Sequence, residues 1–133
     1  MSLTITSRPD RNFHVLTVAG NLTLGPHLRG LQQMARAALE AGPPEGLIVD
    51  VSGLRYADSA GLGELTILYT LCRKDCILVL SGVPSQLKQM LELTRLDALL
   101  PSATDIEAAK RHVKLEWQKR RGAQGAQDAV AGE

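Results

Sequence analysis

Two short apolar runs constrain the fold of this chain more than any other feature. "GLIVDV" begins at Gly46 and "CILVL" begins at Cys76, and both are nearly continuous stretches of aliphatic and β-branched residues. Such runs are typical of strands that are covered on both faces, in the middle of a sheet flanked by helices. Between them, apolar residues recur at helical spacing, which predicts a helix over residues 60–73. The centre of the fold is therefore predicted to be a strand, a helix and a second strand.

The segments around this unit predict the rest of the sheet. "LTITS" and "FHVLTVAG" alternate apolar and polar residues around "RPDRN", which predicts an antiparallel hairpin of residues 3–7 with 13–19. Helical spacing predicts one helix over residues 26–41 and another from Pro84 to about Leu93. We therefore expect an α/β fold, with a mixed β-sheet made of an N-terminal antiparallel hairpin and then β-α-β units, and about four helices packed on it.

The fourth helix is predicted from a capping box. In "TDIE", Thr104 and Glu107 have the spacing at which two side chains satisfy each other's backbone donors at a helix start. Its outer side and end are basic, without an identified partner, and we expect it to end near Arg121. The segment 122–133 has almost no large apolar side chain, which predicts a flexible tail after a domain of residues 1–121. The predicted inward face consists of Ile106, Ala109, Val113 and Trp117.

Composition excludes several classes of protein. The 133 residues are 44% hydrophobic and 22% charged, with a formal net charge of +1, which indicates one globular domain without a broad nucleic-acid-binding surface. We find no secretory leader and no apolar run near the roughly 20 residues of a membrane span, so a cytoplasmic location is expected. Cys72 and Cys76 lack the spacing of a redox or zinc motif. We expect two buried thiols, no metal and no cofactor.

The stretch "YADSAGLGEL", residues 56–65, joins the first apolar run to the helix that follows. Its serine resembles that of the nucleophile elbow G-x-S-x-G, but Ala57 stands where that motif needs glycine. A hydrolase would also need a base, and the histidines lie in the predicted hairpin, at the first helix and on the last helix: His14, His27 and His112. Serine hydrolysis is therefore the least favoured function.

A nucleotide or anion site is a second interpretation of the same stretch. "GLGELT", from Gly61 to Thr66, departs from the dinucleotide fingerprint, which needs glycine or alanine at its last position. The chain also has no G-K-[ST] sequence. Backbone N–H groups at a helix start can still hold a small anion weakly.

Helix capping is the simplest interpretation. The side chain of either Asp58 or Ser59 can accept a hydrogen bond from the first turn of the helix, a role worth about 1 kcal/mol. A cap does not account for Gly61 and Gly63, because each glycine inside a helix costs about 1 kcal/mol relative to alanine. We interpret the pair as bare backbone that another molecule approaches closely.

These residues carry a resemblance to a known family. "GLIVDVSGLRYADSAGLGEL", followed by a helix, the block "ILVLSGVPSQLKQMLELTRLDALLP" and a final helix, resembles the STAS domain of bacterial anti-sigma factor antagonists. The resemblance covers about residues 3–115. Its most specific part is a strand, then "D-x-S-G", then "D-S-x-G-L-G" at the start of a helix.

The resemblance implies a function in signal transduction and transcription regulation by partner switching. It places the phosphorylation site at Ser59 and implies a non-enzymatic phosphoprotein. The unphosphorylated form would bind an anti-sigma factor that is also a serine kinase, phosphorylation would release it, and a serine phosphatase would reverse the modification. No direct contact with nucleic acid or membrane is implied. The expected partner-binding residues are Asp58, Ser59, Ala60, Gly61, Leu62 and Gly63.

One departure from the family concerns the end of the second strand. Many members have an aspartate in a "G-x-L-D" stretch there, whereas this chain has "GNLT", which ends at Thr23. We interpret Thr23 as a turn residue rather than as a second phosphate acceptor. The alternative function is a STAS module for ligand sensing or scaffolding, which would bind a small anion or a nucleotide without control by a kinase.

Overall fold

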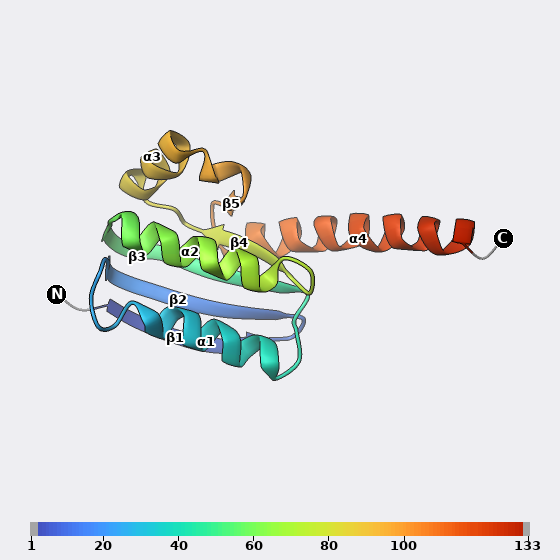
Figure 1. Ribbon diagram of the computed structural model, residues 1–133, viewed down its shortest axis with the longest axis horizontal. Helices are drawn as coiled ribbons and strands as arrows, with labels where there is room; N and C mark the ends of the chain where they lie inside the picture. Colours follow the sequence, from blue (N-terminus) through green and yellow to red (C-terminus); the bar gives the residue numbers. More distant parts are fainter. Residues whose placement is uncertain (1–2, 132–133) are drawn as a thin grey trace.

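The computed structural model describes residues 3–131, with side chains described as far as residue 122. Five strands form one sheet in the order β1-β2-β3-β4-β5 (Figure 1). This is the predicted mixed sheet with four helices. The elements in chain order are β1 (Leu3–Asp10), β2 (Phe13–Leu22), α1 (Arg29–Glu40), β3 (Gly46–Ala57), α2 (Ser59–Cys72), β4 (Ile77–Ser81), α3 (Ser85–Thr94), the 3-10 helix η1 (Leu96–Ala98), β5 (Ser102–Ala103) and α4 (Ile106–Ala131).

The predicted hairpin is confirmed and is longer than expected. β1 and β2 pair antiparallel from Leu3 opposite Gly20 to Asp10 opposite Phe13. Pro9 lies within β1, which is tolerated because β1 is at the edge of the sheet, where a missing N–H group breaks no ladder. The turn therefore contains only residues 11 and 12.

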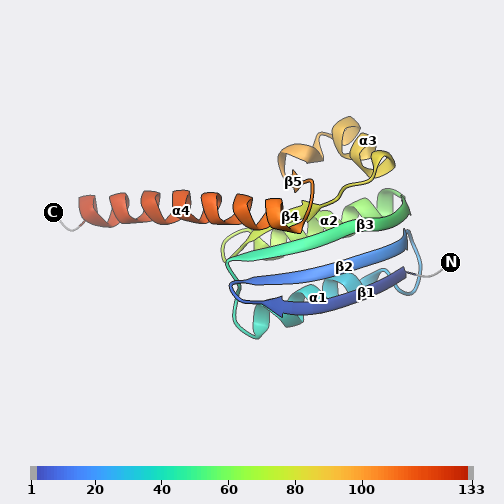
Figure 2. The same cartoon turned by 180° about the vertical axis from the view of Figure 1, so that it is seen from behind.

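The two apolar runs form adjacent parallel strands, as predicted. β3 pairs in parallel with β2 on one side and with β4 on the other. Figure 1 shows α1 and α2 in front of the sheet, and Figure 2 shows α4 running outward past the sheet. Along β3, Leu47 and Val49 belong to the core cluster that includes side chains of α1 and α2, whereas Ile48 packs with Ala109 and Val113 of α4. Helices on both faces explain why these runs are almost entirely apolar.

The predicted cap of the fourth helix is wrong by one residue. Asp105, not Thr104, precedes α4, and its Oδ1 accepts a hydrogen bond from the N–H group of Ala108 at 2.8 Å. Glu107 does not close a capping box; its carboxylate lies 3.4 Å from the ammonium group of Lys110. An aspartate caps as well as a threonine does, so the residue next in the chain can take the role. The predicted inward face is confirmed: Ala109 and Val113 are buried, and Ile106 and Trp117 pack beside them.

The predicted end of the fourth helix is also wrong. α4 does not stop near Arg121 but continues to Ala131. The segment after Gly122 is rich in alanine and glutamine and contains no proline, and extending an existing helix costs far less than starting one. Composition predicted poor packing there, but helix formation does not require packing. The domain boundary after residue 121 stays a prediction.

Cys72 and Cys76 are buried free thiols, as expected. Cys72 is the last residue of α2 and Cys76 directly precedes β4, and the N–H group of Cys76 donates to the carbonyl oxygen of Cys72 at 2.9 Å. The neighbouring Cys76 thiol and burial together raise the pKa of Cys72. Within residues 3–131, none of the helices combines the length and apolar character needed to cross a membrane.

Candidate functional site

The start of α2 is capped by Asp58. Its Oδ1 accepts from the N–H group of Gly61 at 2.9 Å, and its backbone is extended, as an N-cap residue requires. Ser59 is the first residue of the helix and is exposed. No hydrogen bond within the described residues uses the Ser59 hydroxyl. The sequence left open which of the two residues caps the helix, and the geometry assigns the cap to Asp58.

The second carboxylate oxygen of Asp58 holds a different part of the chain. Oδ2 accepts from the N–H group of Leu24 at 3.0 Å, just beyond the end of β2. The N–H groups of Gly61 and then of Leu24 hold the pKa of Asp58 below its usual value, because they stabilise the charged form. The Asp58 N–H group also donates to the carbonyl oxygen of Leu22 at 3.2 Å. Asp58 therefore joins α2 to the segment that follows β2.

The end of β3 is fixed by a glutamine from α3. The Ala57 N–H group donates to Oε1 of Gln86 at 2.9 Å, and Nε2 of Gln86 donates to the Ala57 carbonyl oxygen at 2.9 Å. The Gln86 amide thus pairs with both backbone groups of Ala57, as a neighbouring strand would, at the residue before the cap. No local sequence signal marks Gln86 or Leu24, because each contacts this site from a distant part of the chain.

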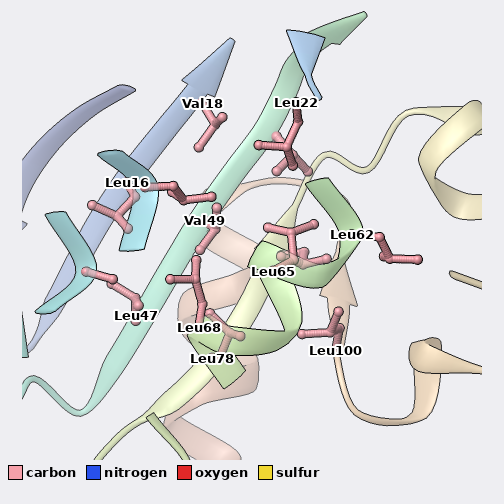
Figure 3. Packing of buried hydrophobic residues seen from close by; sticks show 14 of the residues in the cluster. Leu16, Val18, Leu22, Leu47, Val49, Leu62, Leu65, Leu68, Leu78 and Leu100 are labelled. Carbon is pink, nitrogen blue, oxygen red and sulfur yellow. The ribbon is translucent and has the colours of Figure 1, made fainter. Parts of the chain in front are cut away.

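The two glycines of α2 have different roles. A Cβ atom on Gly61 would lie 2.0 Å from the carbonyl oxygen of Leu22, whereas one on Gly63 would meet no atom within 4 Å. The prediction that both glycines leave backbone bare for another molecule is wrong for Gly61, because β2 already occupies that space. Leu62 is only 5% exposed. Figure 3 shows Leu62 among the buried side chains that include Leu22.

The exposed residues of α2, some polar and some apolar, form a narrow stripe along one side of the helix. Its members recur every three or four residues, as they must to share one face of a helix. They are Ser59, Gly63, Ile67 and Thr70. Beyond the helix start, the side chain of Leu24 is 79% exposed. Of the six residues predicted to bind a partner, the structure places Ser59 and Gly63 at the surface, Asp58 and Ala60 partly at the surface, and Gly61 and Leu62 in the interior.

Several cavities among the described residues lie away from this helix start, and three of them are well defined. One of about 270 Å³ is lined by Cys72, Cys76 and His112 at the opposite end of α2. A second cavity, of about 500 Å³, lies beside the start of α4. A third, of about 400 Å³, lies beside the β1-β2 turn. None of the three is lined by a residue of the segment 58–63.

Catalytic and metal chemistry gain no support at this position. His14 hydrogen-bonds with Ser7 across the hairpin, and His112 lies on α4. In the described part of the chain, no hydrogen bond joins a histidine to Ser59. Among the side chains described, no three His, Cys, Asp or Glu residues gather in an arrangement suited to a metal ion.

Comparison with solved structures gives proteins of the same fold. An anti-sigma factor antagonist from Mycobacterium paratuberculosis is 23% identical, with a TM-score of 0.74, over 85% of this chain and 95% of that one. An anti-sigma factor antagonist (STAS) domain protein from Planctomyces limnophilus is 16% identical, with a TM-score of 0.62, over 82% of this chain and 96% of that one. A sulfate transporter family protein from Wolinella succinogenes is 21% identical, with a TM-score of 0.63, over 78% and 86% of the two chains.

The sequence comparisons give the family. No curated protein matches this chain. The family model described as "Mlab, STAS domain" matches residues 5–101, which is more than half of the chain. The matched region runs from β1 to the residue before β5 and includes the whole α2 start with Asp58 and Ser59. The chain belongs to the STAS domain family.

Proposed function

We propose that this STAS domain is an anti-sigma factor antagonist-like regulatory protein that is switched by phosphorylation of Ser59. In the unphosphorylated state it binds an anti-sigma factor that is also a serine kinase. The kinase transfers the γ-phosphoryl group of ATP to the Ser59 hydroxyl, which loses its proton, and ADP leaves. A serine phosphatase hydrolyses the phosphoester and restores the hydroxyl. The protein acts in the cytoplasm, as a substrate rather than as a catalyst.

One observation carries this proposal: Asp58, not Ser59, caps α2. If Ser59 were the cap, a phosphate on its oxygen would remove a bond that the fold needs. Because Asp58 fills that role, the exposed hydroxyl can be modified without breaking a hydrogen bond of its own. The phosphate adds a charge of about −1.5 to −2, and the positive end of the α2 dipole stabilises that charge.

The same charge weakens binding to a partner. An interface that covers the start of α2 would remove the phosphate from water beside the Asp58 carboxylate, and a buried unpaired charge is costly. Of the residues predicted to bind the partner, Ser59, Ala60 and Gly63 are accessible for contact. Gly61 and Leu62 shape the surface from beneath it. Modification thus alters an interaction without unfolding the domain.

Phosphorylation in vitro tests the proposal. The purified protein is incubated with ATP and each candidate serine kinase from the same genome, and the modified residue is mapped by tandem mass spectrometry. We expect one phosphate on Ser59 and none on Ser59→Ala. Ser85→Ala is the matched control, because Ser85 is likewise the exposed first residue of a helix, and this variant should be phosphorylated like the wild type. A phosphate on Thr23 or Ser85 instead would contradict the proposal.

A further inference from the structure

A loop beside Ser59 is held in place by the residue that precedes Ser59. Residues 23–27, the Leu24 loop, connect the buried side chains of Leu22 and Leu28. One hydrogen bond lies within this connection, from the Leu28 N–H group to the Gly25 carbonyl oxygen at 3.3 Å. The bond from the Leu24 N–H group to Oδ2 of Asp58, at 3.0 Å, ties the loop to the start of α2.

One carboxylate therefore performs two tasks. Oδ1 of Asp58 caps α2 through the N–H group of Gly61 while Oδ2 tethers the Leu24 loop. The two tasks share one side-chain orientation, so a change that turns the carboxylate affects both. Asp58 is also the immediate neighbour of Ser59, where the proposed function places the phosphate.

A phosphate on Ser59 would compete with Asp58 for the helix start. Phosphate oxygens on the first residue of a helix can accept from the free N–H groups of the first turn, including that of Gly61. The doubly charged phosphate would also repel the adjacent carboxylate. Both effects move Asp58 away from its present position, and the Leu24 tether depends on that position.

We propose that phosphorylation of Ser59 releases the Leu24 loop by displacing Asp58, so that the modification disorganises the partner surface as well as charging it. This inference rests on the proposed function, because it concerns the regulation of the same residue. The Leu24 side chain, 79% exposed, is an apolar group of the loop that Asp58 holds at the start of α2. A tethered loop binds with a smaller loss of conformational entropy than a free one. Asp58 is thus a positioning residue that links the modified serine to a contact segment.

Amide hydrogen exchange tests this link in the isolated protein. Phosphoserine is incorporated at position 59 during translation, so that no kinase is needed, and exchange is followed residue by residue by NMR. We expect the Leu24 amide to exchange about tenfold faster than in the unmodified chain, because loss of its hydrogen bond lowers its protection. The amides of Leu47 and Val49, in the central strand, should keep their rates. Ser59→Asn is the uncharged control and should leave the Leu24 amide unchanged.

Asp58→Asn separates the tether from the cap. Asparagine caps helices as well as aspartate does, and its single carbonyl oxygen can serve Gly61, but its NH₂ group cannot accept from Leu24. We expect this variant to keep its fold and to show fast Leu24 exchange already without phosphate. Phosphoserine at position 59 should then add no further change, because the tether is already absent.

Two outcomes would overturn the inference. One is an unchanged Leu24 exchange rate in the phosphoserine chain while Asp58→Asn accelerates it, which would show that phosphate and carboxylate coexist. The other is an unchanged rate in Asp58→Asn itself, which would show that the tether does not protect this amide. Neither outcome involves a kinase, so failure of this inference is distinguishable from failure of the proposed function.

Discussion

Two helices of this domain begin with an aspartate cap, and only one of them carries a candidate site. Oδ1 of Asp105 accepts from the Ala108 N–H group at 2.8 Å, and Oδ1 of Asp58 accepts from the Gly61 N–H group at 2.9 Å. At α4 the cap is followed by an apolar residue and a glutamate. A negative charge in the first turn is stabilised by the helix dipole, so these residues serve the helix itself. At α2 the cap also holds Leu24, and an exposed serine follows it. The cap is what both helices need in order to begin. The Leu24 contact and the exposed serine are present only at α2, and these are the features that a function must explain.

The largest expected effect concerns the glycines that distinguish the start of α2. Gly61→Ala should lower the free energy of unfolding by about 3 kcal/mol, because the new Cβ must push back the backbone oxygen of Leu22, which cannot rotate away. Gly63→Ala should raise it by up to about 1 kcal/mol, since alanine favours the helix and space is open there. Urea denaturation of both variants measures the difference. Equal effects would show that Gly61 is not required by packing against β2.

The second effect compares the two caps directly. Asp105→Ala should lower the free energy of unfolding by about 1 kcal/mol, the usual cost of losing a cap, and Asp58→Ala by about 2 kcal/mol, because it also removes the Leu24 tether. The same denaturation experiment measures both. A loss at Asp58 no larger than that at Asp105 would indicate that the tether adds nothing to stability.

Acid titration gives a smaller effect. The pKa of Asp58 is lowered in the folded protein, so the unfolded chain takes up the proton first as the pH falls. The stability that Asp58 contributes is therefore present above about pH 4 and is lost as the pH falls through its folded-state pKa. Asp58→Asn should lose less free energy of unfolding than the wild type between about pH 5 and pH 2. Some loss of stability in acid should remain in Asp58→Asn, because Lys110 lowers the pKa of Asp10 in the folded protein as well.

The smallest effect is expected at the far end of α4. Deleting residues 122–133 should change the melting temperature by less than about 1 °C, because the segment lacks large apolar side chains that could pack. Before this point, Arg120 makes a long hydrogen bond of 3.4 Å to the Cys76 carbonyl oxygen. Differential scanning calorimetry of the shortened chain tests the boundary. A decrease of several degrees would place the segment inside the domain.

The fold was largely predictable from the sequence because its main signals are local. Apolar runs, alternation and helical spacing each concern neighbouring residues, and they identified the hairpin, the central strands and α2. The sequence narrows the N-cap of α2 to Asp58 or Ser59. It does not decide between them, since aspartate and serine cap helices equally well. The composition of residues 122–133 does not predict the full length of α4, because a lack of packing side chains does not prevent a helix from continuing.

The connections of the site could not be predicted. Leu24 and Asp58 are 34 residues apart, and Ala57 and Gln86 are 29 apart. These hydrogen bonds join side chains to backbone groups, and any aspartate or glutamine offers the same atoms, so no spacing rule identifies the partners. The role of Gly61 likewise depends on the position of β2. The sequence therefore identifies the helix start of the candidate site, and tertiary contacts define what surrounds it.

Calorimetric titration tests the central claim, that Ser59 is a switch rather than a cap. Ser59→Ala and Ser59→Asp are titrated with the anti-sigma factor kinase that phosphorylates the wild type. Both variants should be about as stable as the wild type, because the Ser59 hydroxyl makes no hydrogen bond within the described residues and the helix start favours a negative charge. Ser59→Ala should bind like the wild type, and Ser59→Asp at least about tenfold more weakly, a difference of about 1.4 kcal/mol. Equal affinities of the two variants would contradict the account.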